Sequence, residues 1–380
     1  MNSPGGTPLF ELPGPSCWAQ SIAEEAARGN SVIVFLPDRF AESDAWGDIA
    51  DLSRILECEE LSLHSDVPLA QSLIDHVGSD GTEPTRGDLL SYVVQWSAMK
   101  NRRLLIRAWE SPVDEVLKRW PQTIHAAGLP PNGRPVLIVV ARKRDLNVTA
   151  AERINLSEIR TTWWWGAVGH LDTELSVARS APHLDRLQRT TVAQLAAWDL
   201  SAASALAFAW DGQMRSLRRT AGEILTSADV SQSASSRSKP RRSPTPPLID
   251  DWSVGSLDTW DGRLRFHADT LSEEGFARSL WHAQARVLLP SLEEARYQIE
   301  EILTRTLPSA VLSSLDQEVR DDGLPEFAAM RRVLRRHGHS VDHGTWKLIT
   351  AAIPVRNSLA HMRPVPIADL EQLLMWLSFE

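Results

Sequence analysis

Residues 346–365 read WKLITAAIPVRNSLAHMRPV, an apolar stretch that runs into the polar pattern Arg356-Asn357-x3-His361. The apolar residues of this stretch predict a helix that leads into the pattern. Asn357 and His361 are four residues apart, so a helix places them on one face. Arg356 lies about 140° from His361 around an ideal helix. We therefore expect its side chain to curl back, or Pro354 to disturb the helix there.

The three polar side chains of this pattern suit the cleavage of an RNA phosphodiester without a metal. An arginine can hold a phosphate, a histidine can move a proton near neutral pH, and an amide can orient either of them. Arg356, Asn357 and His361 are therefore candidate catalytic residues. The alternative is a solvated helix end on which the same residues have no role in chemistry.

With its surroundings, the pattern Arg356-Asn357-x3-His361 resembles the R-polar-x3-H signature of the HEPN superfamily. These are small helical domains, many of which are endoribonucleases that need no metal. The resemblance covers roughly residues 270–380, with an apolar helix before the motif and a last helix behind it. It implies an all-α, HEPN-like helical bundle in this part of the chain.

The resemblance also implies a role for each residue of the motif. His361 would act as general base on the ribose 2′-hydroxyl or as general acid on the leaving 5′-oxygen. Arg356 would neutralise charge on the phosphorane, and Asn357 would orient Arg356 or the phosphate. The products would be a 2′,3′-cyclic phosphate and a 5′-hydroxyl. Because one motif supplies a single histidine and HEPN nucleases pair two motifs face to face, we expect a homodimer through the C-terminal domain.

Two functions of different classes are open at this point. The first is a HEPN endoribonuclease in a toxin or antiviral defence setting, with RNA as substrate and the N-terminal domain as sensor or as the site of a protein partner or antitoxin. The second is a catalytically silent HEPN-fold component that serves dimerisation in a multi-protein system. The intact motif favours the first, whereas the net charge of −9 favours the second.

Capping signals and apolar periodicity predict further helices in the C-terminal part. Ser272 before two glutamates marks a helix start, and Pro290 is placed in the first turn of the next helix. The expected helices lie at residues 272–288, 290–306, 325–336, 345–353 and 367–377.

Basic residues gather near the motif. From residue 325 to residue 365 the chain has seven Lys or Arg and two acidic residues. A basic strip of this kind suits an RNA backbone, and a solvated helix face explains it equally well. The candidate RNA-binding residues are Arg331, Arg332, Arg335, Arg336 and Arg363.

A group of histidines, His337, His339 and His343, lies beside Asp342 and offers the residue types that bind zinc. The group stands in a Gly-containing loop without cysteines, which favours an ordinary loop over a metal site. We expect neither a metal nor a cofactor.

The N-terminal half alternates apolar runs with helical stretches. The runs at residues 31–36, 60–63, 103–107 and 135–140 predict buried strands, with helices at 88–100 and 112–127 between them. Continuous rather than alternating hydrophobicity is typical of strands covered on both faces. The expected fold is an α/β domain with a parallel sheet.

The order of these elements resembles the core of AAA and STAND-type P-loop ATPases. That fold needs a Gly-rich loop with Lys-Ser or Lys-Thr after the first strand, to hold phosphates. Here Pro37-Asp38-Arg39-Phe40 follows that strand, and the third strand leads to Glu110 alone instead of an Asp-Glu pair. The domain therefore lacks a phosphate-binding loop, as a degenerate relative of that fold or as an unrelated doubly wound sheet.

Composition suggests four parts of the chain. Residues 1–160 form the α/β domain, 161–226 a helical extension, 227–250 a disordered Ser/Pro/Arg linker and 251–380 the HEPN-like domain. The Trp163-Trp164-Trp165 run at the start of the extension invites a role in base stacking, but large aromatic residues are mostly core residues. We expect these three to pack under the following helices.

The remaining features exclude several classes of protein. Only Cys17 and Cys58 are present, so the chain has neither a disulfide framework nor a cysteine zinc site. No apolar run approaches the roughly 18 residues that span a bilayer, and the first residues do not form a signal peptide. We expect a cytoplasmic protein that does not associate with membranes.

Overall fold

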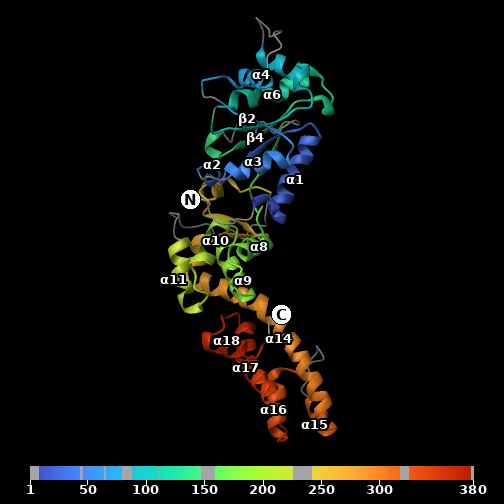
Figure 1. The fold of residues 1–380 in the computed structure, drawn as a ribbon, viewed down its shortest axis with the longest axis vertical. Coiled ribbons are helices and arrows are strands. Elements are labelled where there is room, and N and C mark those ends of the chain that lie inside the picture. Colours follow the sequence, from blue (N-terminus) through green and yellow to red (C-terminus); the bar gives the residue numbers. More distant parts are fainter. Residues whose placement is uncertain are drawn as a thin grey trace. The chain divides into compact units, whose positions relative to one another are not determined.

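The computed structural model describes residues 8–42, 46–63, 66–78, 88–110, 112–146, 159–225, 242–316 and 325–377. The chain forms two compact units, each built from two segments (Figure 1). The first consists of Met1–Leu175 and Ser227–Phe266, and the second of Ser176–Thr226 and His267–Glu380. The segments 161–175 and 251–266, which we expected in the helical parts, thus cluster with the first unit.

The first unit is built on a five-stranded parallel sheet in the order β2-β3-β4-β1-β5. All residues of β1 and β4 are buried, as their continuous apolar sequences predict. The predicted α/β fold is confirmed. The strands are β1 (Ser31–Phe35), β2 (Glu59–Leu61), β3 (Arg103–Arg107), β4 (Val136–Ala141) and β5 (Ile159–Trp163).

Helices cover both faces of this sheet, with α4 and α6 on one side and α1 and α3 on the other (Figure 1). The buried indole of Trp120 on α6 donates to Ser31 Oγ at 3.0 Å, and Ser31 Oγ also accepts from the Leu137 amide at 3.0 Å. One serine thus joins α6, β1 and β4. The helices are α1 (Pro13–Ala27), α2 (Arg39–Glu42), α3 (Trp46–Ile55), α4 (Leu69–Val77), α5 (Leu89–Gln95) and α6 (Asp114–Ala127), with short 3-10 turns at Leu9–Glu11, Ser97–Met99, Pro131–Gly133 and Lys143–Asp145.

The second segment of this unit is a helical turn and a hairpin. It comprises a 3-10 turn (Pro246–Leu248), α12 (Ile249–Ser253) and the antiparallel strands β6 (Leu257–Trp260) and β7 (Arg263–Phe266). The hairpin turns at Asp261 and Gly262, whose φ angles are 50° and 71°, as a two-residue Asp-Gly turn requires. The predicted linker 227–250 lies outside the described residues up to 241. Its end is ordered, because Leu248 and Ile249 are buried.

The second unit is all-α, as predicted. Its first part closes a small core around Trp210 and Leu217. The helices between residues 170 and 225 agree with the helical extension predicted for this part of the chain. The helices are α8 (His170–Ser180), which begins in the first unit, α9 (Arg186–Ala196), α10 (Leu200–Ala209), α11 (Met214–Leu225) and α13 (His267–Leu271).

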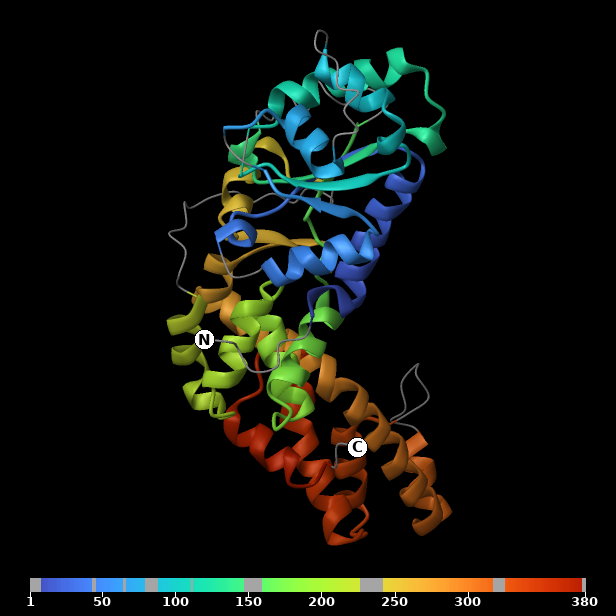
Figure 2. The same cartoon turned by 45° about the horizontal axis from the view of Figure 1, so that its top comes forward.

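The C-terminal helices are joined to the long helix α14 through α17, which packs on α14, α16 and α18 (Figure 2). Its side chain cap is Ser272, which accepts a hydrogen bond from the Gly275 amide at 3.0 Å, as predicted. The helices are α14 (Glu273–Thr306), α15 (Ser309–Asp316), α16 (Phe327–Arg336), α17 (His343–Ala360) and α18 (Ile367–Leu374).

Two expectations about proline are wrong. The predicted helices 272–288 and 290–306 are one continuous helix with Pro290 inside it, and the helix expected to end at 353 continues through Pro354 to Ala360. A proline inside a helix costs about 3 kcal/mol. Apolar residues on both sides of each proline are buried in one core, so packing outweighs this cost. None of the described helices combines the length and the apolar character needed to cross a membrane.

Candidate functional site

The predicted catalytic motif lies at the C-terminal end of α17. Asn357 belongs to the last turn, and His361 is the residue that caps the helix. Both side chains are exposed. The structure therefore places these two residues at one solvent-facing helix end, as their spacing predicts.

The backbone beyond His361 forms a regular helix stop. Met362 has a φ angle of 54°, and its amide donates to the Leu359 carbonyl at 3.1 Å. The Arg363 amide donates to the Ser358 carbonyl at 2.9 Å. This pair of bonds around a left-handed residue is a Schellman motif, which satisfies carbonyl groups at the helix end. It fixes the backbone on both sides of His361.

Helix α14 holds this helix end in place through two further bonds. The Trp281 indole donates to the Leu359 carbonyl at 2.9 Å, and the Gln284 side chain accepts from the Val365 amide at 2.8 Å. Gln284 is buried, so its bond to Val365 is shielded from water. The turn that carries His361 is thereby attached to α14 both before and after the histidine.

Arg356 points to a different set of partners. Its Nε lies 3.6 Å from Glu293 Oε1, and its Nη2 lies 3.9 Å from Glu326 Oε1. Arg296, of which 5% is exposed, pairs with the same two carboxylates, at 2.6 Å from Glu293 and 3.6 Å from Glu326. We call Glu293, Arg296, Glu326 and Arg356 the four-charge cluster.

The four-charge cluster joins α14, the start of α16 and α17. Its two arginines and two glutamates balance in charge, which permits Arg296 to be buried. The ion pairs of Arg356 within the described residues are with Glu293 and Glu326. In this arrangement Asn357 and His361 share one face of α17, while Arg356 is held on another.

The candidate RNA-binding arginines lie mostly on the surface of α16. Arg332, Arg335 and Arg336 are exposed, and Arg331 is half-buried. The guanidinium of Arg335 lies 5.5 Å from the ring centroid of Trp346 on α17. Such a cation–π contact orients the arginine without neutralising it. Arg363, also exposed, follows the helix stop.

His343 of the histidine group and the adjacent Asp342 make other contacts in the described structure. Asp342 caps α17 by accepting from the Thr345 amide at 3.0 Å, and the Thr345 hydrogen bonds lower the pKa of this carboxyl. The His343 ring meets Trp376 edge-on at 5.7 Å. Among the described residues, no three His, Cys, Asp or Glu side chains form a group that could hold a metal ion.

The carboxyl edge of the sheet in the first unit is a second candidate ligand site. The strands β1 and β4 are adjacent. The connection from β1 runs to β2 on one side of the sheet, whereas the connection from β4 runs to β5 on the other side. Ligands of doubly wound sheets bind at such a point. Here the Asp38 amide, directly after β1, donates to the Ser253 carbonyl of α12 at 2.7 Å.

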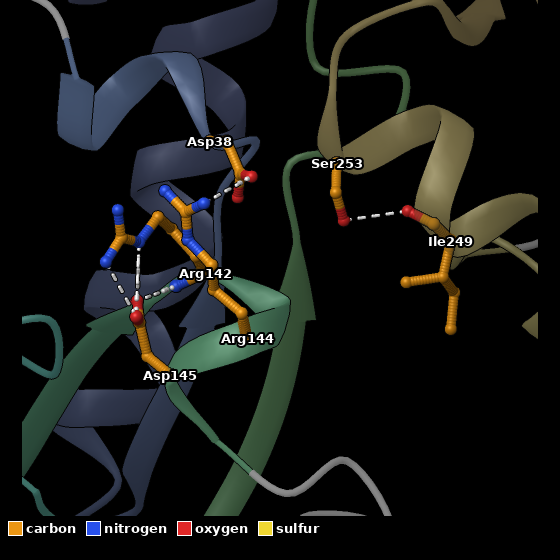
Figure 3. A network of polar contacts seen from close by, with 6 residues as sticks. All are labelled: Asp38, Arg142, Arg144, Asp145, Ile249 and Ser253. Carbon is orange, nitrogen blue, oxygen red and sulfur yellow. Dashed lines mark hydrogen bonds and ion pairs between the residues drawn. The ribbon is translucent and has the colours of Figure 1, made fainter.

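Charged side chains at this edge pair with one another (Figure 3). Arg144 Nη1 lies 3.5 Å from Asp38 Oδ2, and Arg142 Nη2 lies 2.8 Å from Asp145 Oδ1. Lys143 pairs with Asp250 of α12. The basic residues after β4 thus have carboxylate partners from the same unit.

Aromatic residues fill the space between this edge and α12. The indole of the buried Trp252 donates to the Trp164 carbonyl at 2.8 Å, and its ring lies 5.2 Å from that of Trp163. Trp164 is fully buried and meets Trp18 at 4.7 Å. Trp164 is therefore a core residue and Trp163 is half-buried, and both pack with α1 and α12 of the first unit instead of under the following helices, where we expected them.

Comparison with known proteins adds little. No protein-family model and no curated protein matches the sequence. A solved structure with some similarity is Cdc6p from Pyrobaculum aerophilum, at 10% sequence identity and a TM-score of 0.31, over 96% of this chain and 93% of that chain. A similarity at this level supports no argument about function.

The sequence patterns did not predict Glu293, Arg296 and Glu326 as residues of the site. A signal for one of them was present, because Arg296 falls on the apolar side of its helix, between Ala295 and Ile299. A charged residue on an apolar face needs a partner of opposite charge. Which carboxylates supply it depends on helix packing and cannot be read from periodicity.

Proposed function

We propose that this chain is a metal-independent endoribonuclease of the HEPN type, with its active site at the C-terminal end of α17. The observation that carries the proposal is the exposed pair Asn357 and His361 on a helix end whose backbone is fixed on both sides. A general acid or base must be accessible to substrate and held in one place. The motif resemblance supplies the reaction class.

The reaction is an internal transesterification of RNA. His361 accepts the proton of a ribose 2′-hydroxyl, and the 2′-oxygen attacks the adjacent phosphorus. The bond from phosphorus to the 5′-oxygen then breaks, and a general acid protonates that oxygen as it leaves. The products are a 2′,3′-cyclic phosphate and a 5′-hydroxyl.

This reaction profits from two proton-transfer groups, and each motif offers one histidine. A second copy of the chain, paired through the C-terminal domain, would supply the other. Arg356 would turn from Glu293 toward the substrate and stabilise the negative charge of the phosphorane. The exposed arginines of α16 and Arg363 would contact the RNA backbone on either side of the cleaved bond.

The first unit would act as sensor or as the site for a protein partner, in a toxin or antiviral defence setting. Its sheet has no phosphate-binding loop after β1, and the Asp38 amide there already donates to Ser253. This supports regulation by a partner rather than by a nucleotide.

One observation favours a second candidate function. Arg356 is paired with Glu293 and Glu326, as a purely structural arginine would be. In that case the bundle is a dimerisation component of a multi-protein system, and Asn357 and His361 are surface residues without a catalytic role.

His361→Ala separates the two candidates. The side chain is exposed, so its removal should leave folding unchanged. The nuclease proposal predicts that the full-length protein degrades single-stranded RNA in EDTA and that His361→Ala reduces the rate at least about 100-fold. His337→Ala, at another exposed histidine that follows α16, is the matched control. Equal rates for wild type and both variants would support the silent component.

A further inference from the structure

We infer that Glu293 competes with RNA for Arg356. In the free protein the Glu293 carboxylate pairs with the Arg356 guanidinium, and a phosphate of the bound RNA takes its place. The inference rests on the proposed function, since it concerns how that site receives its substrate. It assigns Glu293 as a positioning residue and makes Arg296 its permanent partner.

The two arginines hold their carboxylates with different strength. Arg296 Nη2 lies 2.6 Å from Glu293 Oε2, within hydrogen-bond distance. Arg356 approaches the other oxygen of Glu293 at 3.6 Å and Glu326 at 3.9 Å. The buried Nε of Arg356 has no hydrogen-bond acceptor among the described residues. Arg356 is thus held by charge attraction at 3.6 and 3.9 Å and not by a hydrogen bond to either carboxylate.

Exposure shows which pair can separate. Arg296 is 5% exposed and must keep a counter-charge, whereas Arg356 is 30% exposed and Glu293 is 41% exposed. An ion pair in contact with water contributes little, because both partners regain hydration when it opens. The pair Glu293–Arg356 can therefore open while the pair Glu293–Arg296 persists.

The two oxygens of Glu293 divide these tasks. Oε2 is bound to Arg296, and Oε1 faces Arg356. When a phosphate binds Arg356, Glu293 has only to turn Oε1 away and can keep its bond to Arg296. The cluster then holds two arginines and three anionic groups, so the carboxylate of Glu293 weakens phosphate binding in the wild-type protein.

Neutralising Glu293 should therefore strengthen binding of RNA. Glu293→Gln retains an oxygen that can accept from Arg296, and Glu326 remains as the counter-charge for the buried arginine. Glu294→Gln is the matched control, because Glu294 is the next residue on α14, carries the same charge and is exposed. It accepts a hydrogen bond from Gln298 on its own helix.

Binding is measured by fluorescence anisotropy of a 2′-O-methyl RNA oligonucleotide with the full-length protein. This probe lacks the attacking hydroxyl, so binding is read without cleavage. We expect Kd to fall about three- to tenfold in Glu293→Gln and to change less than twofold in Glu294→Gln. In a protein that carries Arg356→Ala, adding Glu293→Gln should leave Kd unchanged. In cleavage assays KM should fall while kcat stays the same.

Equal affinities of Glu293→Gln and Glu294→Gln would overturn the inference, and so would a gain that persists without Arg356. If Glu293→Gln lowers the unfolding temperature, Glu326→Gln tests the same point, and an unchanged Kd there contradicts it. The proposed function fails separately. A protein that shows the gain in binding and cleaves no RNA refutes the nuclease and leaves the role of Glu293 standing.

Discussion

The indole nitrogen of Trp281 on α14 donates a hydrogen bond to the carbonyl oxygen of Leu359 at 2.9 Å. Leu359 belongs to the last turn of α17, two residues before His361, and the same carbonyl accepts from the Met362 amide at 3.1 Å. The long helix α14 thereby holds the helix end that carries the proposed catalytic histidine. A residue outside the motif thus fixes its geometry.

Replacing Trp281 by phenylalanine should loosen this helix end. The substitution removes the N–H donor and the pyrrole part of the indole, so the free energy of unfolding should fall by about 1–3 kcal/mol. The cleavage rate should fall by more than the loss of folded protein explains, because the turn with His361 gains freedom. Urea unfolding and RNA cleavage rates measure the two effects. Trp376→Phe, another half-buried Trp in the second unit, is the control and should leave kcat unchanged.

Removing Arg296 should destabilise the second unit strongly. The side chain is 5% exposed and serves two carboxylates, so Arg296→Ala leaves Glu293 and Glu326 without their main partner. Deleting a long buried side chain leaves a cavity and leaves both carboxylates to Arg356 alone, so we expect a cost of about 2–5 kcal/mol. Arg305→Ala on the same helix removes an exposed arginine paired with Glu301 and should cost no more than about 1 kcal/mol. Urea unfolding followed by circular dichroism compares them, and equal costs would contradict the assigned role.

Asp258 should make the first unit less stable as the pH rises. Its carboxyl accepts from the Gly166 amide at 2.9 Å and the Thr259 amide at 2.7 Å, and complete burial raises its pKa to about 7. In the unfolded chain an aspartate titrates near 3.9, so the folded state binds more protons between the two values. The contribution of Asp258 to stability is therefore fully present below about pH 4 and is lost as the pH rises to about 7.

Asp258→Asn tests this dependence, since the amide oxygen can still accept both backbone hydrogen bonds. Urea midpoints at pH 5 and pH 7.5 should differ less in this variant than in wild type. Asp250→Asn, a largely exposed aspartate in the same segment, should keep the wild-type difference. If Asp258→Asn keeps it too, the titration belongs to other groups.

ATP with magnesium should not stabilise the protein. The loop after β1 has no lysine or glycine to hold phosphates, and the Asp38 amide donates to Ser253 at 2.7 Å. A ligand that binds the folded state raises the unfolding temperature with concentration. We expect no saturable rise in thermal unfolding up to millimolar ATP. A saturable rise would show that the carboxyl edge accepts nucleotides after all.

The sequence predicted best what depends on local patterns. The apolar runs of β1 and β4 and the Ser272 cap follow from burial and backbone chemistry within a few residues. The helix ends predicted near Pro290 and Pro354 were wrong, because packing along α14 and α17 outweighs the local cost of a proline. Tertiary burial of this kind cannot be summed from local propensity.

The same distinction holds for the candidate site. The shared face of Asn357 and His361 follows from helical spacing, and the structure places both at one exposed helix end. The partners of Arg356 come from α14 and the start of α16, far away in sequence. Their positions depend on how three helices pack, which the motif does not encode.

The most direct test of the central claim is the chemistry of the cut ends. Full-length protein is incubated with a single-stranded RNA in EDTA, and the new 3′ ends are examined by ³¹P NMR. Transesterification by His361 predicts a 2′,3′-cyclic phosphate, a 5′-hydroxyl on the other fragment and neither product with His361→Ala. A 3′-hydroxyl with a 5′-phosphate, or cyclic phosphate formed equally by His361→Ala, would contradict the proposed mechanism.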